Sequence, residues 1–290
     1  MAIYFFGAVI IALFFYVWRV LTPKKEQLLQ VPDKWKLLLN EHVHFYQNLN
    51  PVQKAQFESD IKHFLGSVPI NGAQVEVTLL DRLLVASSAV IPLFGFPQWT
   101  YKYLDEVILY PESFDQNYHI GGPEARISGM VGNGPMEGKV ILSKPALHNG
   151  FDIKNDKRNV GIHEFAHLFD KEDGEIDGIP PAMHDKMHSI PWMELIKKKT
   201  DEIKKGKSDI NEYAAYNEKE FFAVACEYFF ERPHLLEDKQ PELYELLSEV
   251  FQQDPSRVID ENSYRDKTEI PRNAPCPCGS GKKYKDCCMK

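Results

Sequence analysis

The sequence contains few cysteines, and their distribution is uneven. Only 5 of its 290 residues are cysteines, and four of these lie among the last fifteen residues. A secreted disulfide framework would spread its cysteines along the chain, so this class of protein is disfavoured. An excess of positive charge is also lacking, because the formal net charge is −8. This balance argues against a nucleic-acid partner.

Long hydrophobic runs are absent except at the N-terminus. Residues 3–21 read IYFFGAVIIALFFYVWRVL, with Arg19 as the single charge, and are long enough to cross a bilayer. Lys24 and Lys25 follow the run and no basic residue precedes it, so the positive-inside rule predicts a cytoplasmic body. We therefore expect a retained anchor that holds the protein at the membrane. A cleaved signal peptide is the alternative, but a basic n-region and a clear cleavage site are missing.

The remaining composition is that of an ordinary globular protein, with 43% hydrophobic and 26% charged residues. One segment stands out within it: residues 163–167 read H-E-F-A-H. With ten histidines in the chain, roughly 0.03 such H-E-x-x-H matches are expected by chance. On a helix, His163 and His167 share a face and can bind one metal ion. Glu164 can then reach a water molecule at that metal, which predicts a hydrolytic zinc site.

A third protein ligand is needed, because catalytic zinc usually takes three. Glu220 and Glu227 are the leading candidates, since they lie two turns apart on one face of the apolar helical segment 218–231. One of them could instead accept a hydrogen bond from a metal-binding imidazole. Asp170 and Asp173 are weaker candidates for the third ligand, because they lie where the chain leaves the helix expected to carry His163 and His167.

The local patterns predict several elements around this motif. We expect helices at residues 81–91, 155–169, 218–231 and 241–253, the second capped by Asn155 or Asp156. We expect strands at residues 75–78, 103–110 and 140–143. The stretch 119–138 is rich in glycine and predicts turns and hairpin loops.

Three segments carry a family resemblance. The run HEFAHLFD, the turn DGEIDGIP and the segment EYAAYNEKEFFAVACEYFFERP resemble the zinc metallopeptidases related to Mlc titration factor A, over residues 35–255. This resemblance implies a mostly helical, zincin-like α+β domain with a small sheet and aminopeptidase-like activity. It also implies that Glu220 is the third zinc ligand. Family members have been linked to binding a glucose-responsive repressor.

The motif residues suggest a mechanism. A zinc ion held by His163, His167 and Glu220 would activate water, and Glu164 would act as the general base. The oxyanion that forms needs a further donor. Tyr213 or Tyr216, just before the ligand helix, could supply a phenol, although packing is the simpler role for each.

The C-terminal residues 275–288 read PCPCGSGKKYKDCC and resemble the SEC-C motif. Four cysteines, Cys276, Cys278, Cys287 and Cys288, can form a structural zinc site. The resemblance implies recruitment of a protein partner. A pair of disulfides is the alternative, and cytoplasmic placement disfavours it. The remaining cysteine, Cys226, is expected in the core.

Taken together, the sequence predicts a transmembrane anchor at residues 1–22, a metallopeptidase domain at 23–265 and a linker with a zinc-binding tail at 266–290. We expect two zinc ions, one catalytic and one structural, and a peptide or protein substrate. The alternative function is a regulatory module that sequesters a partner such as a transcriptional repressor.

Overall fold

The computed structural model describes residues 31–96, 99–183, 186–260, 275 and 282–283, without the side chains of residues 186–189. The chain divides into two units, Met1–Pro32 and Asp33–Lys290, and every element named below belongs to the second. The helices before the active segment are α2 (Asp33–His42), α3 (His44–Asn48), α4 (Pro51–Ser67), α5 (Leu79–Leu93) and α6 (Lys144–Asp152). The later helices are α7 (Val160–Asp170), α8 (Lys186–Lys204), α9 (Glu218–Glu231), α10 (Pro233–Lys239), α11 (Pro241–Phe251) and α12 (Pro255–Val258). Short 3₁₀ turns occur at η1 (Gly134–Met136), η2 (Lys171–Asp173), η3 (Pro181–Met183) and η4 (Glu212–Ala215).

The four described strands form one mixed sheet in the order β1-β2-β4-β3. They are β1 (Ile70–Gly72), β2 (Glu106–Tyr110), β3 (Gly129–Val131) and β4 (Lys139–Ser143). β1, β2 and β4 run parallel, with Val107 opposite Val140, whereas β3 is antiparallel to β4. The expected fold class, mostly helical α+β with a small sheet, is confirmed at this level.

Alternation along β2 and β4 separates the two faces of the sheet. Val107, Leu109, Val140 and Leu142 point into the main core that the helices share. On the opposite face Tyr110 and Ile141 pack with the buried ring of Phe114 in a smaller cluster. The glycine-rich stretch that follows Phe114 therefore covers the outer face of the sheet.

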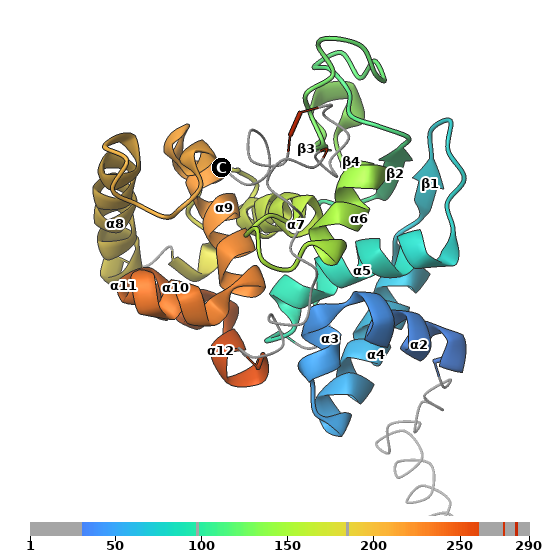
Figure 1. Ribbon diagram of the computed structural model, residues 1–290, viewed down its shortest axis with the longest axis horizontal. Coiled ribbons are helices and arrows are strands. Elements are labelled where there is room, and N and C mark those ends of the chain that lie inside the picture. Colours follow the sequence, from blue (N-terminus) through green and yellow to red (C-terminus); the bar gives the residue numbers. More distant parts are fainter. Residues whose placement is uncertain (1–30, 97–98, 184–185, 261–274, 276–281, 284–290) are drawn as a thin grey trace, which may run out of the picture. The chain divides into compact units, whose positions relative to one another are not determined.

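Helix α7 lies among α5, α6 and α9 and also contacts β3 (Figure 1). Its contact with α5 is close because Gly161 has no side chain: an added Cβ would lie 2.0 Å from Ser88 Oγ. The sequence predicts a helix at residues 155–169, but α7 begins five residues later, at Val160. The reason is that Asn159, rather than Asn155 or Asp156, accepts the hydrogen bond from Ile162 N (3.1 Å) that caps the helix.

The strand expected at residues 75–78 is wrong, since the structure assigns no strand there. Thr78 instead caps α5, which extends from Leu79 to Leu93. The expected strand at 140–143 and the helix at 218–231 are confirmed as β4 and α9. The helix at 241–253 ends at Phe251.

The expectation of a membrane-anchored protein requires correction. The anchor predicted at residues 3–21 lies outside the described residues. Among the helices that the structure describes, none is long and apolar enough to cross a bilayer. The longest of these, α8, has 19 residues but is rich in lysine. The structure thus gives a membrane-anchored location no support, and the cytoplasmic placement inferred from the anchor loses its basis.

Candidate metal centre

Two imidazoles and one carboxylate converge between α7 and α9. Their potential ligand atoms all lie within 4.8 Å of one another. Glu220 Oε2 is 3.1 Å from His163 Nε2 and 3.5 Å from His167 Nε2. Zinc bonds of about 2.0–2.1 Å in a tetrahedral site put neighbouring ligand atoms about 3.3 Å apart. The donor set and its spacing therefore fit a metal ion such as zinc.

The local sequence explains why these groups meet. His163 and His167 are four residues apart on α7, and their rings lie edge to face with centroids 4.8 Å apart. Glu220 lies in the first turn of α9, where Asn217 caps the helix by accepting a hydrogen bond from Glu220 N (2.9 Å). Both ligand helices thus begin at an asparagine cap, which fixes the first turn of each.

Glu227 has a different position from Glu220. Its Oε1 lies 2.8 Å from His163 Nδ1, and its Oε2 accepts a hydrogen bond from Asn159 N (2.6 Å). A carboxylate at Nδ1 keeps the proton on that nitrogen and leaves Nε2 free to bind a metal. Glu227 therefore orients His163 rather than joining the converging atoms, which is the second role that the sequence left open.

The charges around the centre favour a cation. Burial alone would lower the pKa of His163, but the charge of Glu227 and hydrogen bonds to Glu220 and Glu227 raise this pKa well above its usual value. Burial likewise opposes ionisation of Glu220, yet hydrogen bonds with both histidines hold the pKa of its carboxyl below the usual range. In the protein without metal, positive charge on an imidazole therefore compensates the buried carboxylates.

His167 lies in a different electrostatic environment. Burial lowers the pKa of its imidazole to about 4, and the positive charge of His163 adds to this effect. The ring is thus neutral at pH 7, the form that a metal ion requires. Its buried Nδ1 has no hydrogen-bond partner among the described atoms.

Glu164 is 5% exposed, and its side chain extends from α7 toward the edge strand β3. Burial, together with the charges of Glu220 and Glu227, raises the pKa of its carboxyl to about 7, although a hydrogen bond from the backbone of Val131 opposes the shift. A carboxyl group that titrates near neutral pH can both accept and release a proton. Gly129 makes room for it, since a Cβ there would lie 2.6 Å from Glu164 Oε1.

Tyr213 borders the centre from η4. Its ring centroid is 6.1 Å from that of His163. Burial raises the pKa of its phenol, and so do the charges of Glu220 and Glu164 and a hydrogen bond to Glu220. The phenol is therefore protonated at neutral pH and able to donate. Tyr216 lies further out, with its ring stacked on that of Tyr213.

Asp170 is buried at the end of α7 but does not join the converging ligand atoms. Its Oδ2 accepts a hydrogen bond from Gly178 N (2.8 Å) and so holds the turn that leaves the helix. Gly178 has a φ of +85°, and a Cβ there would lie 2.5 Å from Glu218 O. The turn therefore packs against the start of α9, close to Glu220.

The cysteines divide into two groups. Cys226 is buried in α9, as expected for a core residue. The four tail cysteines, Cys276, Cys278, Cys287 and Cys288, lie outside the described residues. Pro275 and Lys283, on either side of the first cysteine pair, form an antiparallel bridge.

The sequence did not predict two features of the centre. Asn159 contacts both Ile162 of α7 and Glu227 of α9, and Gly129 lies close to Glu164. Asn159 has a signal in the sequence, because asparagine is a preferred cap and precedes the apolar stripe of the helix. Gly129 has none, since its role depends on how closely β3 approaches α7.

The sequence matches the profile of the glucose-regulated metallo-peptidase M90 family over residues 18–252 and that of the SEC-C motif over residues 272–290. Mlc titration factor A of Yersinia pestis (strain Pestoides F) and that of Yersinia pseudotuberculosis (strain YPIII) are each 29% identical over 272 residues, covering 87% of this chain and 95% of the relative. An uncharacterized protein of Synechocystis sp. (strain PCC 6803), slr2042, is 27% identical over 263 residues, covering 84% of this chain and 94% of the relative.

Proposed function

This chain belongs to the glucose-regulated metallo-peptidase M90 family, and on that premise we propose that it is a zinc-dependent peptidase. The observation that carries the proposal is the convergence of His163, His167 and Glu220 beside the buried carboxyl of Glu164. A structural zinc site is closed by four protein ligands and has no use for a carboxylate that can exchange a proton. Three ligands and an adjacent base favour hydrolysis.

Each residue of the centre has a separate role in the proposed reaction. His163, His167 and Glu220 would hold the zinc ion, which when bound supplies a Lewis acid that polarises a peptide carbonyl and acidifies water. Glu227 keeps His163 in the tautomer that exposes Nε2. The carboxylate of Glu164 accepts the proton of the attacking water and delivers it to the leaving amine.

Tyr213 is the proposed donor to the oxygen that becomes negatively charged during the reaction. Its phenol is protonated at neutral pH, because burial and the charges of Glu220 and Glu164 raise its pKa. A donor at this position would stabilise negative charge developing on the carbonyl oxygen.

The main chain of a peptide substrate also needs a partner on the protein for hydrogen bonding. β3 is at an edge of the described sheet, and its three residues are partly exposed. An edge strand can pair with an extended peptide through main-chain hydrogen bonds. Since Gly129 and Val131 of this strand lie against Glu164, a peptide paired there would run past the proposed base.

The test of this function is the substitution Glu164→Gln. It keeps the shape of the side chain but removes the group that accepts the proton, so we expect bound zinc to remain and hydrolysis to fall by at least about a hundredfold. Zinc is measured by elemental analysis and hydrolysis with longer peptides and aminoacyl chromogenic substrates. Turnover of the aminoacyl compounds would support the proposed aminopeptidase-like action. Hydrolysis by the variant at the parental rate would refute the role of Glu164.

A second function is favoured by the Yersinia relatives, whose name says that they titrate Mlc. In that case this chain would bind a partner protein, such as a transcriptional repressor, and sequester it. The two proposals differ in outcome: a protein that binds zinc at His163, His167 and Glu220 but hydrolyses no peptide of a broad panel would favour the binding function.

A further inference from the structure

Two exposed tyrosines form a continuous aromatic surface beside the metal centre. Tyr213 lies next to His163, with ring centroids 6.1 Å apart and planes inclined by 34°. The ring of Tyr216 continues outward, 6.1 Å from that of Tyr213 and nearly parallel to it at 12°. Tyr213 is 51% exposed and Tyr216 is 75% exposed. The surface therefore begins at a metal-binding imidazole and extends into solvent.

The backbone that carries these rings is ordered by local hydrogen bonds. Asn211 Oδ1 accepts from Tyr213 N (3.0 Å), Asn211 O accepts from Ala214 N (3.0 Å), and Tyr213 O accepts from Tyr216 N (3.1 Å). Ala214 is fully buried, and η4 packs against α8 and α9. The backbone that carries the two rings is thus ordered before any ligand arrives, which reduces the entropic cost of binding to them.

Packing does not account for the outer ring. Single exposed aromatic residues are common on protein surfaces and need no explanation. Here, however, two exposed rings are stacked on each other, and the inner one lies beside His163. The exposed parts of both rings are therefore available to a ligand that approaches the metal centre.

We propose that Tyr213 and Tyr216 form an aromatic subsite that binds the aromatic or large aliphatic side chain of a peptide residue next to the bond that is cleaved. This inference rests on the proposed peptidase function. The two rings form a surface about large enough to contact one side chain. A stable protein–protein interface is much larger, since it buries about 800 Å² on each partner. A single side chain, held beside the reacting bond, is the occupant that the size and place of this surface fit.

The test measures peptide binding without turnover. In the Glu164→Gln background, calorimetry compares Ala-Ala-Phe-Ala-Ala with the all-alanine pentapeptide. Stacking of one ring against tyrosine predicts that the phenylalanine peptide binds about three- to tenfold more tightly. Adding Tyr216→Ala should bring the ratio of the two affinities close to one, and adding Tyr216→Phe should preserve it.

Leu37→Ala serves as the matched control, because Leu37 is also an exposed apolar residue, at 66%, but lies on α2. It should leave the affinity ratio unchanged. The subsite is refuted if the two peptides bind equally, if neither binds, or if Tyr216→Ala preserves the ratio. Selective binding by a protein whose parental form hydrolyses no peptide would overturn the proposed function but not the subsite. Hydrolysis without selectivity would overturn the subsite alone.

Discussion

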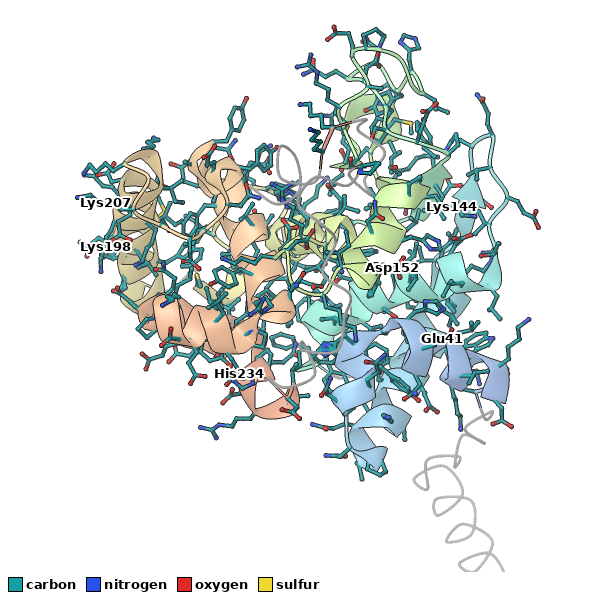
Figure 2. All side chains as sticks on the ribbon, in the orientation of Figure 1. Glu41, Lys144, Asp152, Lys198, Lys207 and His234 are labelled. Atoms are coloured by element: carbon teal, nitrogen blue, oxygen red, sulfur yellow. The ribbon has the colours of Figure 1, made fainter. Side chains whose placement is uncertain are left out.

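Asp81 is a fully buried carboxylate at the start of α5 with three partners. Its Oδ1 lies 2.6 Å from His148 Nε2, and its Oδ2 lies 2.8 Å from the ammonium group of Lys144, which is labelled in Figure 2. Oδ2 also accepts a hydrogen bond from Thr78 N (2.7 Å). Burial raises the pKa of this carboxyl, but the hydrogen bonds from His148, Lys144 and Thr78 outweigh burial and hold its pKa well below the usual range.

This arrangement predicts a pH-dependent loss of stability in Asp81→Asn. The folded-state pKa is depressed, so the ionised group stabilises the fold above its unfolded pKa of about 3.9 and loses that effect as the pH falls further. We expect the variant to lose about 3 kcal/mol of unfolding free energy at pH 7, because the partly buried ammonium group of Lys144 loses its fully buried charged partner. The difference from the parental protein should shrink below about pH 4.

Urea denaturation at pH 7 and at pH 3.5 measures this difference. Glu242→Gln is the control, since its pair with Lys198 is exposed and should contribute less than about 1 kcal/mol at either pH. A constant difference between Asp81→Asn and the parental protein at both pH values would refute the role assigned to the ion pair.

At the scale of single residues, the sequence was informative where spacing alone decides the geometry. The four-residue separation of His163 and His167 requires a shared face on any helix, and in the structure their rings are in contact, edge to face. Glu220 and Glu227 could not be told apart in this way, because both lie on one face of α9. Their roles depend on how α9 is offset along α7, which is a tertiary property.

At the scale of elements, Asn159 connects the two ligand helices. Its side chain caps α7 at Ile162 N, and its own N–H donates to Glu227 Oε2. Its amide nitrogen also donates to Gly150 O (3.1 Å), so the residue ties the start of α7 to both α6 and α9. The position of Glu227, and through it the orientation of His163, thus depends on this cap.

Replacing Asn159 should therefore weaken metal binding as well as the fold. We expect Asn159→Ala to lose about 1–2 kcal/mol of stability as a helix cap. Disturbing the carboxylate that orients a metal-binding imidazole should also weaken zinc affinity by about tenfold or more. Competition with a chromogenic chelator measures the affinity.

Asn50→Ala is the matched control. Asn50 caps α4 by accepting hydrogen bonds from Val52 N and Gln53 N, both 3.0 Å, and α4 carries none of the proposed ligands. This variant should lose a similar stability with unchanged zinc affinity. If both variants bind zinc with the affinity of the parental protein, Asn159 caps α7 but does not support metal binding.

The elements predicted from sequence agree with the structure where one strong pattern is present. The apolar stretches 140–143 and 218–231 correspond to β4 and α9. The error at residues 75–78 arose because two alternating valines also fit a loop, and the Thr78–Asp81 capping box decided in favour of a helix start. The late start of α7 has a similar cause, since Asn155, Asp156 and Asn159 are all acceptable caps and packing selects one of them.

At the scale of the whole molecule, we propose a metallopeptidase domain at residues 23–265, followed by a linker and a zinc-binding tail at 266–290. The two family matches, at 18–252 and 272–290, do not overlap and so support this division. The SEC-C match supports a second, structural zinc ion held by Cys276, Cys278, Cys287 and Cys288, and a protein partner for the tail.

If the metallopeptidase domain and the cysteine tail each bind zinc, removing the tail should remove only one of the two zinc ions. The full chain should bind two zinc ions per molecule, and the chain lacking residues 273–290 should bind one and keep its peptidase activity. Elemental analysis of both proteins, with peptide hydrolysis measured in parallel, checks this. Equal zinc content in the two proteins would contradict a zinc site in the tail.

The proposed activity requires that His163, His167 and Glu220 hold one zinc ion. Anomalous diffraction from crystals of the protein, recorded above and below the zinc absorption edge, tests it most directly. We expect one strong zinc peak within bonding distance of Nε2 of both histidines and of the Glu220 carboxylate. Absence of a peak among these three groups in zinc-loaded crystals, or a peak whose ligands exclude Glu220, would contradict it.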